Sequence, residues 1–288
     1  MIVAIIGAGA WGTALAIAAA RGGADVRLWS FDGKTAEFEG ADILPQISVT
    51  RDMAEIKDAD AWLIATPSEF FANTMAGAAA FYNNQPIIIC TKGADAATGQ
   101  FMSQILARHI PGCADVAVLA GPQFAAELAR GVPTGSTVAG TKRARDAAHG
   151  ALGTAIDLED SDDIIGAEFC GTGKNAMALI SGYLSVCASG ENARALIFTR
   201  AWGEVIKIAL AHGAKIETFS QLCGIGDLFL SATSTTSRNF SGGIAIAHGE
   251  VPVGTVEGIC ALRGLLVRAR NKDIAAPTLY DMAQKMDI

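Results

Sequence analysis

The sequence lacks the long apolar runs of a membrane protein and the basic excess of a nucleic-acid-binding protein. A membrane-spanning helix needs about 20 consecutive apolar residues, and no run in this chain approaches that length. Lys and Arg number 22 against 29 Asp and Glu, which gives a formal net charge of −7. Nonspecific binding to nucleic acid needs a basic surface. We therefore expect neither a membrane span nor a nucleic-acid partner.

The chain also lacks the residue spacings of a metal site. Its six cysteines are scattered and include no C-x-x-C pair. Its four histidines have no metal-ligand spacing. Scattered cysteines are typical of reduced thiols in a cytoplasmic protein. The sequence therefore predicts no metal site and a cytoplasmic location.

Buried strands are predicted in the first half of the chain. Hydrophobic residues make up 51% of the 288 residues, which indicates a well-packed protein, and the length predicts two domains. Continuous apolar strands with helices between them predict a parallel sheet covered on both faces, with ligands beyond the carboxyl ends of its strands. We expect the turns after these strands to line one crevice. The predicted strands are Ile2–Ile6, Asp25–Trp29, Ile47–Val49, Ala61–Ala65, Pro86–Thr91, Val116–Ala120 and Pro133–Ala139.

The second half has apolar residues at helical spacing and no strand alternation. We expect the acidic stretch Glu159–Asp163 to be a solvated linker. The sequence therefore predicts a Rossmann-type doubly wound α/β sheet in residues 1–163, followed by an all-helical substrate-binding domain in residues 164–288. The predicted helices of this second domain are Gly166–Cys187, Glu191–His212, Val256–Asn271 and Thr278–Met286.

A glycine pattern follows the first predicted strand. Gly7, Gly9 and Gly12 have the spacing G-x-G-x-x-G and precede a predicted helix, Thr13–Arg21. Gly7 allows a tight turn, Gly9 lets a pyrophosphate approach the backbone, and Gly12 lets the helix pack against the sheet. The pattern predicts a dinucleotide site; the alternative is a glycine turn that binds nothing.

Three basic residues stand out by their context. Lys92 ends a predicted strand, and Arg238 follows the polar stretch Ser231–Thr236. Lys174 lies in an otherwise apolar helix. Burial lowers the pKa of a lysine and suits it to proton transfer; the alternative is a lysine that extends to water. A guanidinium offers a rigid donor fork that matches a phosphate.

Six segments occur in an order that resembles one enzyme family. Together they are similar to the NAD(P)-dependent glycerol-3-phosphate dehydrogenases of the bacterial type, and the resemblance extends from residue 1 to about residue 280. The segments are GAGAWGTALA, LAGPQFAAELARGVPT, the GKN helix, GENARALIFTR, GIGDLFLSATSTTSRN and VEGI.

The resemblance implies an oxidoreductase that interconverts dihydroxyacetone phosphate and sn-glycerol 3-phosphate and feeds glycerophospholipid synthesis. Lys174 would be the catalytic lysine that exchanges a proton with the substrate oxygen. Lys92 would orient that oxygen near the nicotinamide. Asp227 would hold the lysine and the substrate in place; an N-cap or turn role is the alternative for this aspartate.

The resemblance also implies the binding residues. Arg238 and Asn239 would bind the substrate phosphate with Ser237 nearby, and Gly121 and Gln123 would lie near the substrate. The partner would be a small phosphorylated three-carbon substrate. The sequence leaves open whether the chain forms a homodimer. The cofactor-binding residues would be Gly7, Gly9, Ala10, Trp11, Gly12, Lys92, Ala125, Arg238 and Glu257.

The choice between NAD and NADP depends on Asp32. This residue lies about 20 residues beyond the glycine turn, where a carboxylate can bond the ribose 2′-hydroxyl and repel a 2′-phosphate. It slightly favours NAD; the alternative is that Asp32 merely begins the turn Asp32-Gly33. For Glu257 the alternative is a surface glutamate in a first helical turn.

The chain departs from the family pattern at a few positions. Gln123 stands where serine is usual, Ser231 replaces a threonine, and Phe240 stands where an arginine is common. Residues 36–50 are contracted. The serine at position 231 keeps the hydroxyl, whereas Phe240 removes one positive charge near the phosphate region. The contraction removes no motif residue.

Two other functions remain open from the sequence. One is a two-domain dehydrogenase of the β-hydroxyacid or 6-phosphogluconate kind, which lacks the GIGDL and SRN segments. The other is a dinucleotide-binding sensor without activity, against which Lys92, Lys174 and Asp227 argue.

Overall fold

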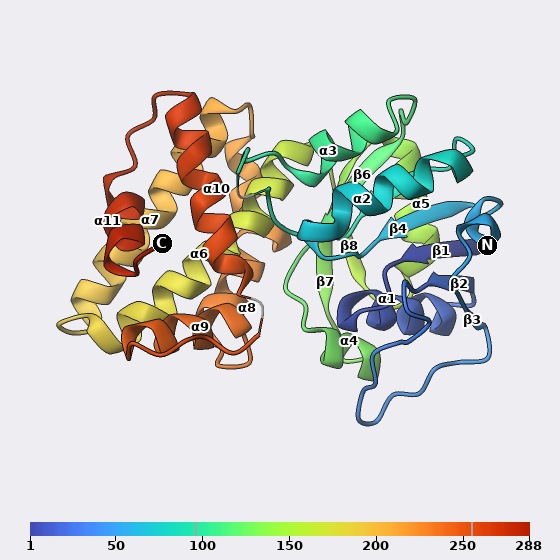
Figure 1. Cartoon of the computed structure of the whole chain (residues 1–288), viewed down its shortest axis with the longest axis horizontal. Helices are drawn as coiled ribbons and strands as arrows, with labels where there is room; N and C mark the ends of the chain where they lie inside the picture. The colour runs from blue at the N-terminus through green and yellow to red at the C-terminus, as the bar shows by residue number, and fades with distance from the viewer. Residues whose placement is uncertain (96, 255) are drawn as a thin grey trace. The chain divides into compact units, whose positions relative to one another are not determined.

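The computed structural model describes residues 1–95, 97–254 and 256–288 as two compact units. The nucleotide-binding unit consists of Met1–Lys92 and Met102–Ile164. The helical unit consists of Gly93–Phe101 and Ile165–Ile288. In Figure 1 the first unit runs mainly from blue to green and the second mainly from yellow to red.

An eight-stranded sheet forms the nucleotide-binding unit, in the order β3-β2-β1-β4-β5-β6-β7-β8. Every neighbouring pair is parallel except β6 and β7, which are antiparallel. The predicted doubly wound fold is therefore confirmed, although the sheet is not parallel throughout. The strands are β1 Ile2–Ile6, β2 Asp25–Trp29, β3 Ile47–Thr50, β4 Ala61–Ile64, β5 Ile87–Ile89, β6 Val116–Ala120, β7 Gly135–Gly140 and β8 Asp157–Ser161.

The strand order reverses at β1. The chain first adds β2 and β3 on one side of β1 and then places β4 on the other. The carboxyl ends of β1 and β4 lie together, because the Ala65 amide donates to the Ile6 carbonyl at 2.8 Å. In open α/β sheets a ligand binds at such a reversal. The glycine turn that follows Ile6 is therefore at the expected place for a nucleotide.

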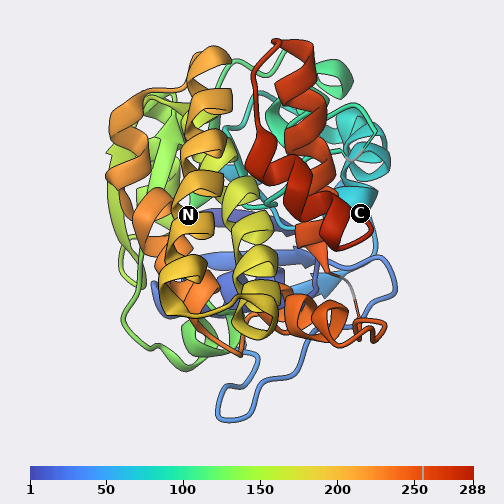
Figure 2. The same cartoon turned by 90° about the vertical axis from the view of Figure 1, so that its left-hand side faces the viewer.

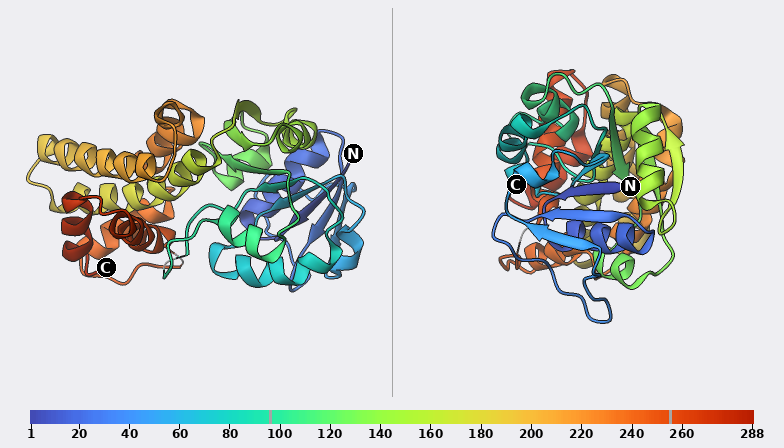
Figure 3. Two further views of the ribbon diagram at one scale, coloured as in Figure 1. Left: turned by 90° about the horizontal axis from the view of Figure 1, so that it is seen from above. Right: turned by 90° about the vertical axis from the view of Figure 1, so that its right-hand side faces the viewer.

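Helices cover both faces of this sheet (Figure 3). α1, α4 and α5 pack together on one face, and α2 packs with α3 on the other. The helices are α1 Ala10–Arg21, α2 Ser68–Ala78, α3 Met102–His109, α4 Ala125–Arg130 and α5 Lys142–Leu152, with short 3-10 helices at Met53–Ile56 and Ala79–Phe81.

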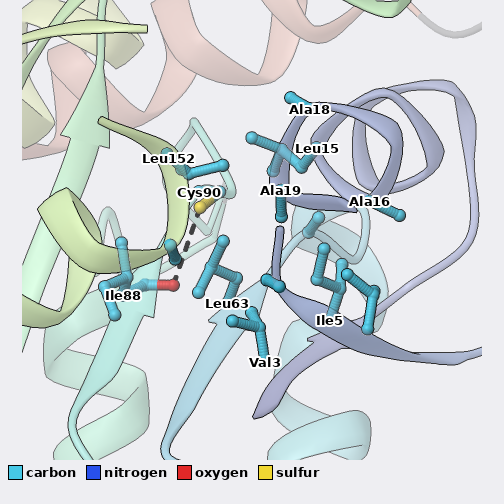
Figure 4. Packing of buried hydrophobic residues seen from close by; sticks show 14 of the residues in the cluster. Val3, Ile5, Leu15, Ala16, Ala18, Ala19, Leu63, Ile88, Cys90 and Leu152 are labelled. Carbon is cyan, nitrogen blue, oxygen red and sulfur yellow. Dashed lines mark hydrogen bonds between the residues drawn. The ribbon is translucent and has the colours of Figure 1, made fainter. Parts of the chain in front are cut away.

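The core of the nucleotide-binding unit lies between the sheet and α1 and α5 (Figure 4). Val3, Ile5 and Leu63 project from the strands toward Leu15 of α1, and Leu152 of α5 completes the cluster. All five side chains are fully buried. This packing fixes the start of α1 against the end of β1, where the glycine turn lies.

The acidic stretch predicted as a linker is instead largely part of the sheet. Asp157–Ser161 forms β8, an edge strand parallel to β7. Its acidic side chains have partners: Thr137 donates to Glu159 at 2.6 Å, and Arg145 and His149 both contact Asp160. Charged side chains are common on edge strands because they discourage pairing with another chain. The prediction of a solvated linker was therefore wrong for this strand.

The helical unit contains no strand among its described residues. The four predicted long helices are present within a few residues of their expected ends, and two further helices, α8 and α9, were not predicted. Figure 2 shows α6 and α7 in yellow and orange and the last two helices in red. The helices are α6 Ile164–Cys187, α7 Glu191–Ala211, α8 Asp227–Thr233, α9 Arg238–Ala247, α10 Glu257–Asn271 and α11 Pro277–Lys285, with a 3-10 helix at Ile216–Ser220 and a π-helical turn at Leu222–Gly226.

Small residues let α6 approach α9 and α10 closely. A Cβ on Gly182 would lie 1.9 Å from the Phe240 carbonyl oxygen, and a Cβ on Gly243 would lie 2.1 Å from that of Leu179. A Cβ on Gly258 would lie 2.6 Å from the Asn175 carbonyl oxygen. No other residue fits at these contacts without movement of backbone, so the glycines set how α9 and α10 lie against α6.

Among the described residues, no helix is both long enough and apolar enough to cross a membrane.

Candidate active site

The glycine turn of the nucleotide-binding unit is closely packed at Gly7 and Gly12 and borders open space at Gly9. Gly7 has φ +112°, a conformation that favours glycine, and a Cβ there would lie 2.8 Å from the Thr66 nitrogen. A Cβ on Gly12 would lie 1.8 Å from the Gly7 carbonyl oxygen. A Cβ on Gly9 would meet nothing within 4 Å. Gly7 and Gly12 are therefore required by the fold, whereas Gly9 borders open space.

Helix α1 presents its amino terminus at this open space. Ala10 is its first residue, and the N-cap is Gly9, which has no side chain to bond the first amides. Such a terminus favours an anion through its amides and its dipole. The indole of Trp11 donates to the Cys90 carbonyl at 3.0 Å and so ties the turn to the end of β5. A direct role of Trp11 with the cofactor stays a prediction.

Asp32 forms the turn that follows β2. Its Oδ1 accepts hydrogen bonds from the Lys34 amide and the Ser30 hydroxyl, both at 3.1 Å. These bonds, the first of them most, hold the pKa of Asp32 below its usual value. The alternative that Asp32 shapes a turn therefore has structural support. The carboxylate is also exposed and charged, so a ribose contact stays a prediction.

Lys92 lies just beyond β5, beside the end of β6. Its Nζ donates to the Gly121 carbonyl at 2.9 Å. Thr91 ties the ends of β4 and β5 together, because its hydroxyl lies 3.2 Å from the Ile64 carbonyl and 2.7 Å from that of Thr66. The strands thus bring Lys92 and Gly121 to the same edge of the sheet.

Gln123 and Ala125 follow β6. Ala125 begins α4 and packs against the core. Both polar atoms of the Gln123 amide are buried and have no hydrogen-bond partner among the described residues. Leaving a buried amide without a partner costs about 1–3 kcal/mol, so this side chain is a candidate for contact with a ligand.

The helical unit holds Lys174 in a buried polar contact. Its Nζ lies 3.1 Å from Oδ1 of Asp227 and 3.0 Å from Oγ of Ser231. The Ser231 hydroxyl also lies 3.3 Å from the Asp227 carboxylate. The Asp227 side chain is 0% exposed and that of Lys174 13%. Lys174 therefore does not extend freely to water.

The position of Asp227 follows from its helix. Asp227 is the first residue of α8, and the N-cap position belongs to Gly226. Its carboxylate lies at the positive end of the helix dipole, which favours a negative charge. The ion pair with Lys174 and the position at the helix terminus together explain why this carboxylate is buried. A role in shaping a turn would not by itself explain its burial.

A second polar network lies beside Lys174. Asn239 donates from Nδ2 to Oδ1 of Asn175 at 2.9 Å, and Asn175 donates from Nδ2 to Glu257 at 3.2 Å. The Gly258 amide donates to Oδ1 of Asn239 at 2.9 Å. Buried polar groups are costly unless bonded, and here the bonds join α6, α9 and the start of α10. Glu257 is therefore only partly exposed, not a simple surface glutamate.

Ser237 and Arg238 form the amino terminus of α9. Ser237 is the N-cap and accepts a bond from the Phe240 amide at 3.4 Å. The Arg238 side chain is exposed, with no hydrogen bond or ion pair to another described residue. Phe240 is buried, and its backbone lies against α6 at Gly182.

Asn175 is a polar residue that the predicted site omitted. It follows Lys174 in the GKN segment and is buried. Its signal in the sequence was an amide inside an apolar helix, a position where polar side chains need specific partners. The structure shows those partners as Asn239 and Glu257.

Two family models match the chain. The model for the amino terminus of NAD-dependent glycerol-3-phosphate dehydrogenase matches residues 2–146, and the model for its carboxyl terminus matches residues 163–285. The chain belongs to this family. As a member it is an NAD(P)-dependent oxidoreductase.

Curated relatives and a solved structure agree with the family models. Glycerol-3-phosphate dehydrogenase (NAD(P)+) of Rhodopseudomonas palustris strain BisA53 is 38% identical over 298 residues, which cover 96% of this chain and 89% of the relative. The enzyme of the same name from Paramagnetospirillum magneticum is 39% identical over 258 residues, which cover 83% of this chain and 92% of the relative. The crystal structure of glycerol-3-phosphate dehydrogenase from Coxiella burnetii has a TM-score of 0.89 at 28% identity, over 100% of this chain and 95% of that one.

Proposed function

We propose that this chain catalyses the NAD(P)-dependent interconversion of dihydroxyacetone phosphate and sn-glycerol 3-phosphate, with Lys174 as the group that exchanges the proton. The observation that carries the proposal is the buried contact of Lys174 with Asp227 and Ser231. The relatives' names support glycerol 3-phosphate as the substrate, and the family's name supports a nicotinamide dinucleotide as the cofactor.

The glycine turn fits a dinucleotide. Open space at Gly9, with the amino terminus of α1 beside it, offers backbone amides to a pyrophosphate. The nicotinamide, when bound, gives or takes a hydride. The exposed carboxylate of Asp32 would repel a 2′-phosphate, which supports a modest preference for NAD over NADP. Ala10, Trp11, Ala125, Arg238 and Glu257 complete the proposed cofactor contacts.

The amino terminus of α9 suits the substrate phosphate. Arg238 supplies an exposed guanidinium that has no competing carboxylate among the described residues. A charge-assisted bond from a guanidinium to a phosphate is stronger than a neutral one. Ser237 and Asn239 flank Arg238, and Asn239 is held in position by Asn175.

Lys174 is proposed to move the proton. In the reducing direction the ketone carbon accepts a hydride, and the carbonyl π electrons pass to the oxygen. The Lys174 ammonium donates a proton to that oxygen and becomes a neutral amine. In the oxidising direction the amine removes the hydroxyl proton. Asp227 keeps the ammonium in place, because its carboxylate lies 3.1 Å from Nζ.

Lys92, Gly121 and Gln123 are proposed to contact the substrate from the nucleotide-binding unit. Lys92 would exchange its bond to the Gly121 carbonyl for one to the substrate oxygen. The buried Gln123 amide, which has no partner among the described residues, would gain one from the substrate. The product would supply glycerophospholipid synthesis in the cytoplasm. All six cysteines are free thiols, which is typical of proteins in a reducing compartment.

A steady-state assay tests the proposal. Purified protein is mixed with NADH or NADPH and dihydroxyacetone phosphate, and oxidation of the nicotinamide is followed by its absorbance. We expect turnover with dihydroxyacetone phosphate and far less with dihydroxyacetone, which has no phosphate for Arg238. Cofactor binding without turnover would contradict the proposal and favour a sensor. Turnover with a 2-keto acid instead would indicate another two-domain dehydrogenase.

A further inference from the structure

The segment Gly93–Phe101 leaves the nucleotide-binding unit directly after Lys92. It packs as part of the helical unit, and the chain returns to the nucleotide-binding unit at Met102. Its two ends meet, because Ala94 and Phe101 form an antiparallel bridge and the Asp95 amide donates to the Gln100 carbonyl at 2.8 Å. The segment is therefore a closed loop whose position depends on what holds it to the helical unit.

Arg268 of α10 holds this loop. Its Nε donates to the Gly99 carbonyl, and its guanidinium carbon lies 3.5 Å from the centre of the Phe101 ring. Arg268 is only 6% exposed. Burial lowers its pKa to about 10, and the charge of Glu168 opposes that effect, so the side chain stays cationic at neutral pH. A buried cation over an aromatic face is a strong contact.

Two glycines allow the loop to lie directly on α10. Gly99 has φ +69°, and a Cβ there would lie 3.2 Å from both Arg268 Cγ and the Gly264 carbonyl oxygen. A Cβ on Gly264 would lie 3.4 Å from that of Ala94. The loop and α10 are thus in contact at Gly264 as well as at Arg268.

The same anchor reaches α6, the helix that carries Lys174. The Arg268 guanidinium carbon lies 5.2 Å from the centre of the Phe169 ring, and the rings of Phe101 and Phe169 pack edge to face with centres 4.8 Å apart. Both rings are buried. Through Phe169 the end of the loop is therefore placed relative to Lys174.

Covalent geometry links this anchor to Lys92. Only Gly93 lies between Lys92 and Ala94, so their Cα atoms are at most about 7 Å apart in any conformation of the chain. Ala94 is itself buried and bridged to Phe101. Whatever fixes Ala94 and Phe101 on α6 and α10 thus restricts where Lys92 can be.

We propose that Arg268 is a positioning residue for Lys92: by clamping the loop Gly93–Phe101 onto α6 and α10, it holds the segment that directly follows Lys92 in the chain. This inference rests on the proposed function, in which both lysines act on one substrate oxygen. A small misplacement of such a group can lower turnover about 100-fold.

A double-mutant cycle tests whether Arg268 acts through Lys92. We expect Arg268→Met to lower kcat for dihydroxyacetone phosphate about 10- to 100-fold, with the dissociation constant of NADH within about twofold of wild type. In a Lys92→Ala background the same change should lower kcat less than about threefold. Arg263→Met, at an exposed arginine of the same helix, is the control and should leave kcat within about twofold.

Hydrogen exchange supplies a readout that is independent of turnover. In Arg268→Met the amides of residues 97–101 should exchange at least about 10-fold faster, whereas those of α7 should not change. If Arg268→Met does not fold, Gly99→Ala is the second variant, because it loosens the same contact and keeps Arg268. Gly99→Ala should show the same selective exchange of the loop amides, and its effect on kcat should depend on Lys92 in the same way.

Two results would overturn the inference. One is an equal loss of kcat in the wild-type and Lys92→Ala backgrounds, which would mean that Arg268 acts on the fold as a whole. The other is faster exchange of the loop with unchanged kcat. An absence of turnover in the wild type would overturn the proposed function together with this inference, whereas the two results above leave that function intact.

Discussion

The two units position their functional groups by different physical means. In the nucleotide-binding unit the path of the backbone sets these positions. Gly7 and Gly12 are packed where a Cβ cannot fit, and Lys92 lies at a strand end. In the helical unit contacts between buried side chains set the position, since Lys174 is held by Asp227 and Ser231. One unit thus depends on the absence of side chains and the other on paired polar side chains.

This difference predicts which changes each unit tolerates. An added methyl group should harm the glycine turn even though it changes no charge. A change of charge or hydrogen bonding should harm the helical unit even when side-chain size is kept.

The largest effect is expected at Lys174. Lys174→Met keeps the length of the side chain and removes the proposed proton donor, so kcat should fall about 1,000-fold, within the range that general acid–base catalysis contributes. Steady-state oxidation of NADH measures this. Lys207→Met, at an exposed lysine of α7, is the matched control. Near-normal kcat in Lys174→Met would remove this lysine from the mechanism.

The glycine turn offers a matched pair of the same substitution. In Gly12→Ala the new Cβ would lie 1.8 Å from the Gly7 carbonyl oxygen. Overpacking of this kind costs about 1–3 kcal/mol of stability, and NADH should bind about 100-fold more weakly because the turn must move. In Gly9→Ala the Cβ meets nothing within 4 Å.

Gly9→Ala should therefore leave the free energy of unfolding within about 0.5 kcal/mol of wild type and still weaken NADH binding. Urea unfolding and NADH fluorescence titration measure the two quantities. If Gly9→Ala binds NADH normally, the pyrophosphate does not approach the backbone there.

Arg238 should show a smaller effect, confined to substrate binding. Loss of a charge-assisted bond to the phosphate should raise KM for dihydroxyacetone phosphate at least about 10-fold in Arg238→Ala. Weak turnover of dihydroxyacetone, which has no phosphate, should not change. Arg200→Ala, at an exposed arginine of α7, is the control. An equal loss with both substrates would place Arg238 elsewhere in the mechanism.

The smallest effect is a pH dependence in the helical unit. Burial, and then the charges of Arg268 and Lys272, hold the pKa of His212 below its ordinary value of 6.5. The unfolded chain therefore binds a proton that the folded unit does not, so stability should fall as pH drops below 6.5.

His212→Gln should reduce this loss. Urea unfolding at about pH 7.5 and about pH 5.5 compares the two proteins. An identical fall in stability in wild type and variant would mean that His212 does not contribute.

The nucleotide-binding unit was the more predictable of the two. Its parallel strands are continuous apolar runs such as Ile87–Ile89. The glycines of the turn follow one another within six residues, so their spacing can be recognised in the sequence. The antiparallel β7 and the edge strand β8 were not anticipated, because β8 reads Asp157–Ser161 and its acidic side chains are partnered by Thr137 and Arg145 only after folding.

The helical unit was predictable in its long helices but not in its contacts. Lys174 stood out as a cation in an apolar helix, whereas its partner Ser231 comes from a helix that was not predicted. Asn175 and the loop Gly93–Phe101 depend on residues distant in the sequence, such as Glu257 and Arg268. Local patterns carry no information about such pairs, and the family resemblance supplied only those that belong to its motifs.

The central claim is that the two units position their groups independently. Its most direct test is the dissociation constant of NADH from Lys174→Met, measured by fluorescence titration on the same preparation whose kcat has been determined. We expect a dissociation constant within about twofold of wild type, because in the proposed mechanism Lys174 exchanges the proton and the glycine turn binds the cofactor. A loss of NADH binding comparable with the loss of turnover would contradict it.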